Sequence, residues 1–114
     1  MEEYTISEAS QICQLNASTL RYYEEAGLLP AIKRNQAKQR LYTIKDLELI
    51  NCVKCFRELG LTVAQIKEQM KASKYEVDVQ TILRDHLAFL YEKRELINHN
   101  IEIIEKKLAK GKEK

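Results

Sequence analysis

Three neighbouring side chains, Arg21, Tyr22 and Tyr23, are the residues of this chain best suited to contact a phosphate backbone. Arginine presents a planar guanidinium fork that matches phosphate oxygens, and the two phenols add hydroxyl donors on rigid rings. The trio lies within residues 18–29, whose apolar side chains recur at helical spacing. A buried helix in a small domain has little use for such a trio on one turn. The segment therefore indicates a helix that contacts nucleic acid.

A short helix and a tight turn precede this segment and would position it. Apolar spacing and capping residues predict helices over residues 6–14 and 17–26, with Asn16 as the N-cap of the second and Gly27 directly after its end. Two short helices joined by a tight turn are typical of a helix-turn-helix, whose second helix enters the major groove of DNA. The trio therefore lies on the predicted recognition helix.

The predicted recognition helix has one face for the core and one for DNA. Leu20 and Leu28 are expected to face the core, whereas the residues expected to face the groove are Ser18, Thr19, Arg21 and Tyr22. Tyr23 fits a core position as well as a DNA contact, because tyrosine readily buries its ring. Helix-turn-helix patterns also occur in helical proteins that bind no DNA, so the interpretation also depends on the neighbouring segment of the chain.

A basic stretch comes directly after the predicted recognition helix. Residues 31–45 contain no acid and five basic side chains, which are Lys33, Arg34, Lys38, Arg40 and Lys45. A basic loop beside a recognition helix is the arrangement of a winged helix, in which the wing contacts phosphates without reading sequence. A lysine-rich loop alone is usually only solvated. Its place after the helix is what predicts a wing over residues 33–40, within an irregular stretch at residues 28–42.

The capping residues at their N-termini predict further helices. Threonine followed three residues later by an acidic or amide side chain is a capping box, and it occurs at residues 5–8, 43–46 and 62–65. These boxes predict helices over residues 44–59 and 63–72, in addition to the first helix. A long helix is predicted over about residues 79–110, which would measure about 45 Å.

The long helix carries an apolar seam. The seam residues follow one another at alternating spacings of four and three. All are apolar except Arg94, and they are Leu83, Leu87, Leu90, Arg94, Ile97, Ile101, Ile104 and Leu108. The preceding chain is too short to cover the whole apolar face, so a second copy of the helix in a two-fold dimer is the expected partner. The alternative is that the helix folds back over its own domain.

Composition limits the function classes. With 114 residues the chain is long enough for one domain with an appended helix, divided here into a DNA-binding domain at residues 1–75 and a dimerisation helix with a basic tail at residues 76–114. No apolar run approaches the roughly 20 residues of a membrane span. The acidic N-terminus lacks the apolar region of a signal peptide, and three cysteines fit a reducing compartment. A cytoplasmic protein with no membrane partner is expected.

Enzyme chemistry is not indicated. His86 and His99 lie on the predicted long helix outside any recognisable acid–base motif, and the sequence contains neither a glycine-rich phosphate loop nor an H-E-x-x-H pair. We expect no catalytic site, no cofactor and no metal. The net charge of +2 is too small to argue DNA binding by itself.

Five segments carry a resemblance to a known family. They read YTISEAS at residues 4–10, TLRYYEEAGLLP at 19–30, RLY at 40–42, DLELI at 46–50 and FRELGLTVAQIKE at 56–68. With them the chain resembles the MerR family of bacterial transcription regulators over about its first seventy residues. The resemblance implies an all-α fold, in which a winged helix-turn-helix domain with a small β wing is followed by a long helix that pairs as an antiparallel coiled coil.

The resemblance also implies a function. A homodimer would bind a palindromic operator in double-stranded DNA between the promoter elements, and would bend and untwist it so that RNA polymerase engages a promoter with too long a spacer. The alternative from the same domain is an architectural or recombination-accessory DNA-binding protein.

The resemblance assigns roles by position. Thr19, Arg21, Tyr22 and Tyr23 would belong to the recognition helix, Arg34, Arg40 and Tyr42 to the first wing, and Arg57 with the turn at residues 60–62, including Thr62, to the second wing. The chain departs from the family pattern at three places. Ser18 stands where arginine is frequent, Gln14 where the turn usually has glycine, and Lys38-Gln39 where the wing tip commonly has Gly-Tyr.

The cysteines raise one further hypothesis. Cys52 and Cys55 are three residues apart on a predicted helix and could share one face. By resemblance, a branch of the family that responds to aldehydes and thiol stress carries a cysteine at the position of Cys55. The alternative is that Cys52 and Cys13 act as small hydrophobic residues. Thiolate metal sensing is not expected, because Val77-Asp78-Val79 stands where metal-sensing relatives have a thiol.

Overall fold

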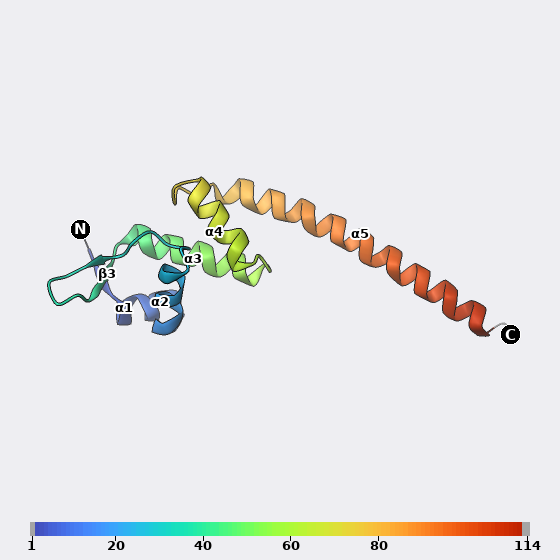
Figure 1. Cartoon of the computed structure of the whole chain (residues 1–114), viewed down its shortest axis with the longest axis horizontal. Coiled ribbons are helices and arrows are strands. Elements are labelled where there is room, and N and C mark those ends of the chain that lie inside the picture. The colour runs from blue at the N-terminus through green and yellow to red at the C-terminus, as the bar shows by residue number, and fades with distance from the viewer. Residues whose placement is uncertain (1, 113–114) are drawn as a thin grey trace. The chain divides into compact units, whose positions relative to one another are not determined.

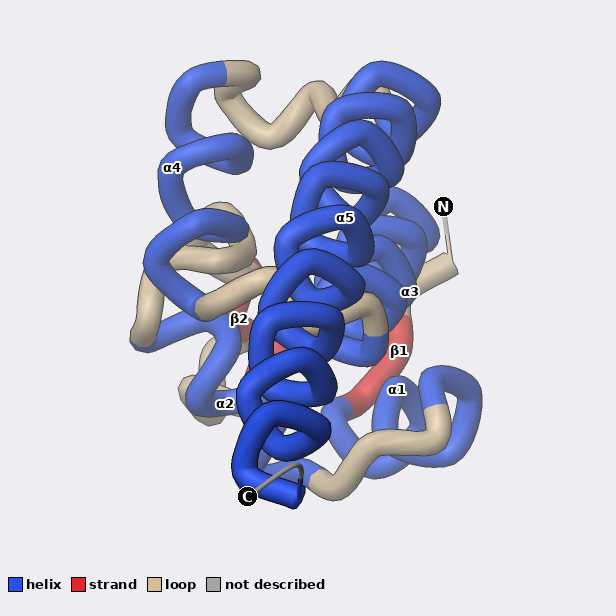
Figure 2. Tube along the Cα trace, turned by 90° about the vertical axis from the view of Figure 1, so that its right-hand side faces the viewer, coloured by secondary structure: helices blue, strands red, loops and turns tan. Residues whose placement is uncertain are grey.

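The computed structural model describes residues 2–112, and the last two residues of the predicted basic tail lie outside them. The chain divides into two compact units, Met1–Val77 and Asp78–Lys114. The first contains β1 (Tyr4–Thr5), α1 (Ile6–Cys13), α2 (Ala17–Glu25), β2 (Lys33–Arg34), β3 (Arg40–Tyr42), α3 (Ile44–Glu58) and α4 (Val63–Ala72). The second is α5 (Val79–Lys112). Figure 1 shows these elements in order, and Figure 2 separates helices from strands by colour. The predicted fold class is confirmed.

The capping residues begin the helices where the sequence predicts. The Thr5 hydroxyl accepts the Glu8 N–H at 3.1 Å and the Glu8 carboxylate accepts the Thr5 N–H at 2.9 Å, which completes the first capping box. The boxes at Thr43 and Thr62 are formed in the same way. The Asn16 side chain accepts the Thr19 N–H at 2.9 Å and so starts α2.

The helix ends differ from the predictions by no more than two residues. Gly27 follows α2 with φ of 84° and Gly60 follows α3 with φ of 94°, a conformation that glycine adopts without steric cost. The end of α1 is different, because Gln14 occupies the left-handed region at φ 56° without being glycine. α5 extends to Lys112, two residues beyond the prediction.

A small antiparallel sheet forms the base of the wing. Its strand order is β1-β3-β2, with Thr5 opposite Leu41 and Arg34 opposite Arg40. β2 and β3 are joined by a turn in which the Asn35 carbonyl accepts the Lys38 N–H at 2.9 Å. The strand β1 was not predicted, because two residues are too few to show a strand period.

The core of the first unit lies among the four helices and the sheet. α1 contacts α2, α3 and the sheet, and α3 contacts α4. The two predicted core residues of the α2 segment, Leu20 and Leu28, are fully buried as expected. The other core side chains with almost no exposure include Ile50, Val53, Phe56, Ile66 and Met70. This packing holds α2 and the wing in a fixed relation to each other.

α5 is a helix of 34 residues, about 50 Å long. Its predicted seam is open to solvent over most of its length, since Leu87, Leu90, Ile97, Ile101, Ile104 and Leu108 are all exposed. Among the described residues, no helix is both long enough and apolar enough to cross a membrane.

Candidate nucleic-acid interface

The outer face of α2 presents the predicted groove residues. Arg21 is exposed, and Tyr22 exposes 50% of its surface. The hydroxyls of Ser18 and Thr19 both donate to the Asn16 side-chain oxygen, at 2.9 and 2.6 Å. They therefore support the N-cap of α2, and each would have to rotate before it could donate to a phosphate. Arg21 and Tyr22 are the α2 side chains free to contact DNA.

Two of the predicted DNA contacts are instead core residues. Tyr42 exposes none of its surface and Tyr23 exposes 7%. Tyr42 ends the central strand β3, where strand alternation directs its ring inward, and Tyr23 follows the buried Leu20 on the inner face of α2 by one helical turn. The Tyr42 ring is therefore placed in the core, and a contact between Tyr42 and DNA stays a prediction. The ring of Tyr23 packs in the core, which was one of its two expected places.

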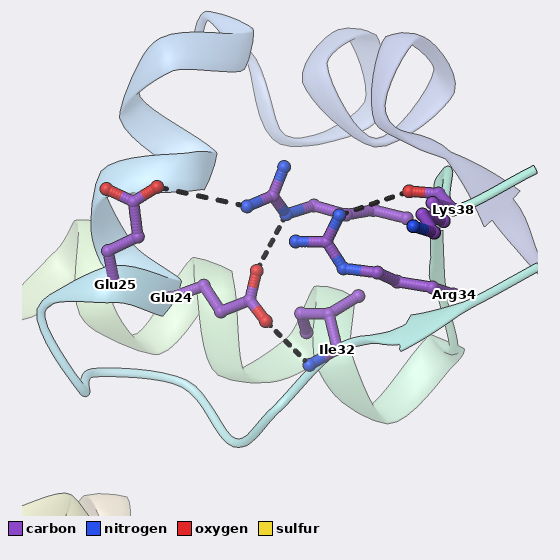
Figure 3. A network of polar contacts seen from close by, with 6 residues as sticks. Glu24, Glu25, Ile32, Arg34 and Lys38 are labelled. Atoms are coloured by element: carbon purple, nitrogen blue, oxygen red, sulfur yellow. Dashed lines mark hydrogen bonds and ion pairs between the residues drawn. The ribbon is translucent and has the colours of Figure 1, made fainter.

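A carboxylate on α2 binds both ends of the wing. Glu24 accepts the Arg40 Nε at 2.7 Å with one oxygen and the Ile32 N–H at 3.0 Å with the other. Figure 3 shows the Glu24 carboxylate with a dashed line to the Ile32 nitrogen, and Glu25 beside it on the same helix. Burial by itself would raise the pKa of Glu24, but the hydrogen bonds from Arg40 and Ile32 outweigh it and hold the pKa below its ordinary value. Arg40, predicted as a phosphate contact, is thus engaged within the protein.

The rest of the wing is basic and exposed. Arg34 Nη1 donates to the Lys38 carbonyl at 3.1 Å across the hairpin, as Figure 3 also shows. Lys33 forms an ion pair with Glu3 at 3.0 Å, which neutralises part of its charge. Lys38 lies in the hairpin turn with φ of 65°, and its side chain is exposed. Lys33, Arg34 and Lys38 are therefore the predicted wing residues that face solvent, and Lys33 is the one that is paired with an acid.

A pocket of about 360 Å³ joins the recognition helix to the wing. Arg21 of α2 lines one side, Lys38, Gln39 and Arg40 of the wing line another, and residues 5–7 at the start of α1 complete it. The first amides of a helix have no acceptor within it, so the amides of residues 6 and 7 at this end of α1 can serve an anion, whereas the Glu8 N–H already donates to the Thr5 hydroxyl. The start of α1 was not among the predicted site residues, although the Thr5 capping box marks its position.

The predicted second wing has a structural role at both of its named residues. Arg57 Nη1 donates to the Leu61 carbonyl at 2.9 Å, and this bond closes the turn between α3 and α4. The Thr62 hydroxyl accepts the Gln65 N–H at 3.1 Å as part of the α4 capping box. Both residues are exposed, so a DNA contact at this turn stays a prediction.

The three cysteines lie in different environments. Cys13 is buried, and burial raises the pKa of its thiol despite the nearby Lys54 ammonium, which donates to the Cys13 carbonyl at 3.1 Å. Burial is also the main cause that raises the pKa of the Cys52 thiol, and the electrostatic effect of the neighbouring Cys55 raises it further. Cys55 is exposed. Within residues 2–112, no group of three or more His, Cys, Asp and Glu side chains is arranged to hold a metal ion.

On α5, two cations of the seam region lie over aromatic rings. The Arg94 guanidinium is 4.9 Å from the centroid of Tyr91, and the Lys93 ammonium is 5.3 Å from that of Phe89. Arg94 therefore packs along its own helix while the apolar seam residues on either side of it stay exposed.

Sequence and structure comparisons with known proteins all find members of one family. Residues 4–73 match the model of the MerR HTH family regulatory proteins. An uncharacterised HTH-type transcriptional regulator of Bacillus subtilis, YyaN, is 33% identical over 111 residues, covering 94% of this chain and 74% of that protein. The chain spans between 45% and 63% of several other curated relatives.

Two solved structures share the fold over nearly the whole chain. The N-terminal part of MtaN, a multidrug transporter activator of Bacillus subtilis, is 26% identical with a TM-score of 0.73, covering 92% of this chain and 97% of that one. HiNmlR, a MerR family regulator lacking the sensor domain and bound to promoter DNA, is 24% identical with a TM-score of 0.68, covering 95% and 89%.

Proposed function

The chain belongs to the MerR family of helix-turn-helix transcription regulators, and from this premise we propose that it acts as a homodimer on a palindromic promoter operator. In this proposal the dimer bends and untwists the operator so that RNA polymerase engages it. Residues 1–75 bind DNA, residues 76–114 hold the dimer together, and the protein works in the cytoplasm without catalysing a reaction.

The pocket between α2 and the wing is the observation that carries the proposal. It joins Arg21 and Lys38, which come from two separate elements, to the start of α1. Cationic side chains and helix N-terminal amides on one concave surface suit a phosphate backbone. Tyr22 and Arg34 are exposed on the same two elements, and Arg57 and Thr62 would contact the flanking phosphates.

The dimer is inferred from α5. Its exposed seam is too apolar to remain in water as a single helix, and a second copy would cover it along about 50 Å. Two copies of α2 would then meet two half-sites, which is why the operator is expected to be palindromic. Ile97 and Ile101 lie in the middle of this seam, next to Arg94.

A transcription assay with varied promoter spacing tests the proposal. Templates carry the operator between promoter elements whose spacer is lengthened one base pair at a time. We expect stimulation by the wild-type protein on long spacers and none by Ile101→Asp, because a buried carboxylate in the seam opposes dimer formation. Lys106→Asp, a charge change near the end of the same helix, is the control. If the protein binds the operator but alters transcription at no spacer length, the proposal is refuted and an architectural DNA-binding role remains.

The exposed thiol of Cys55 favours a second, regulatory role in the same protein. Cys55 is the exposed cysteine among the three, whereas Cys13 is buried. We expect Cys55→Ser to retain DNA binding and to lose any response to an aldehyde or other electrophile, with Cys52→Ser as the matched control. If the response survives in Cys55→Ser, Cys55 is not the sensor.

A further inference from the structure

Glu24 lies in the DNA-binding unit but is itself an acid, and an acid on a surface that meets phosphates should weaken binding. Its carboxylate is only 15% exposed and both of its oxygens are used. The two donors come from opposite ends of the wing, since Ile32 directly precedes β2 and Arg40 begins β3. A single side chain near the end of α2 thus binds the segment that leads into β2 and the first residue of β3.

We propose that Glu24 is a positioning residue for DNA binding, whose carboxylate fixes the wing against the recognition helix and withholds Arg40 from the phosphates. This inference rests on the proposed function and assigns separate tasks to residues of similar charge. Lys33, Arg34 and Lys38 carry the exposed charge of the wing, whereas Arg40 anchors the hairpin.

The geometry of Arg40 supports this division. Its side chain is 14% exposed, and the Nε that faces Glu24 at 2.7 Å belongs to the same planar group as the Nη2 that lies 4.0 Å from Glu25. A guanidinium held in a fixed plane by a short charge-assisted hydrogen bond cannot turn to a phosphate without losing that bond. Arg34, by contrast, donates to a backbone carbonyl and remains exposed.

Glu25 provides a matched control on the same helix. It is the next residue, it has the same charge, and its side chain is 71% exposed. Electrostatics alone predicts that neutralising either glutamate strengthens DNA binding, because both carry a negative charge near the phosphates. If Glu24 positions the wing, the two substitutions have opposite effects on DNA affinity. Neutralising Glu24 weakens binding, and neutralising Glu25 does not, because only Glu24 holds the wing.

The first measurement is made without DNA. Amide hydrogen exchange is followed at Ile32 in the full-length protein, in Glu24→Gln and in Glu25→Gln. Glutamine keeps the shape of Glu24 but removes its charge, so the hydrogen bonds from Ile32 and from Arg40 are no longer charge-assisted. We therefore expect the Ile32 amide to exchange about tenfold faster in Glu24→Gln and at the wild-type rate in Glu25→Gln. An unchanged rate in Glu24→Gln overturns the proposal.

The second measurement is DNA affinity across a series of salt concentrations, on a duplex selected from a random pool with the wild-type protein. We expect Glu24→Gln to bind about tenfold more weakly and Glu25→Gln to bind as tightly as wild type or more tightly. Arg40→Gln should bind more weakly with an unchanged salt slope. The salt slope is the slope of the logarithm of the binding constant against the logarithm of the salt concentration. If Arg40→Gln reduces its magnitude by about 0.9, Arg40 contacts a phosphate and the proposal is overturned.

The two measurements separate this inference from the proposed function. If the wild-type protein selects no duplex over random DNA, the proposed function fails, while Ile32 exchange still tests the positioning role of Glu24. If the wild-type protein binds its duplex and Glu24→Gln binds equally well, the positioning role is refuted and the proposed function stands.

Discussion

Replacing Tyr42 with phenylalanine separates a core role from a DNA contact. The Tyr42 ring is fully buried, and within residues 2–112 its hydroxyl has no hydrogen-bond partner. An unpaired buried hydroxyl costs about 1–3 kcal/mol, and Tyr42→Phe removes this cost while the ring keeps its packing. We expect the free energy of unfolding to rise by about 1 kcal/mol, which raises the melting temperature by about 4–8 °C for a domain of this size.

The assay is urea unfolding at one fixed protein concentration, because the stability of a dimer depends on concentration. DNA affinity is measured on the same samples, and we expect it to be unchanged in Tyr42→Phe. Tyr22→Phe is the matched control, since half of the surface of Tyr22 is exposed. That variant should unfold like the wild type and bind DNA more weakly.

A loss of about 1 kcal/mol or more in Tyr42→Phe would refute the reasoning, because it would show that the hydroxyl is hydrogen-bonded in the folded protein. Weaker DNA binding by a fully folded Tyr42→Phe would contradict the buried position and support the wing contact that the sequence predicts.

Local geometry supports three further predictions. Gln14→Gly should raise the free energy of unfolding in urea by up to about 1 kcal/mol, because Gln14 holds a left-handed conformation at φ 56° that glycine adopts without strain; a loss of stability would contradict this. Under a thiol-alkylating reagent followed by mass spectrometry, Cys55 should react first, and Cys52 and Cys13 later, because burial raises the pKa of both of the latter thiols; early labelling of Cys13 would contradict its buried position. The pKa of Glu24 is lowered in the folded protein, so its stabilisation is present above the ordinary value of 4.5 and is lost as the pH falls through the lowered pKa. The stability difference between wild type and Glu24→Gln should therefore shrink below about pH 4.5, and a difference that grows in acid would contradict it.

The helix framework was predictable because its signals are local. A capping box such as Thr5 with Glu8 joins residues three apart, so the sequence alone shows where a helix begins. The apolar seam of α5 was predictable for the same reason, since its period depends only on adjacent turns of the helix.

The environments of individual side chains were not predictable in this way. Tyr22 and Tyr42 are the same residue type, and only the packing of β3 against the core makes one a surface group and the other a buried one. Arg40 and Glu24 are sixteen residues apart in sequence, and no local pattern indicates that they pair. The short strand β1 finds its partner only when β3 folds beside it.

The affinity of the dimer for a selected palindrome, compared with a scrambled duplex of equal length, tests the central claim most directly. It is measured by fluorescence anisotropy at several salt concentrations. We expect the palindrome to bind at least about a thousandfold more tightly than the scrambled duplex, with one dimer per duplex and an affinity that falls steeply with salt. Equal affinity for the two duplexes at every salt concentration would contradict the claim.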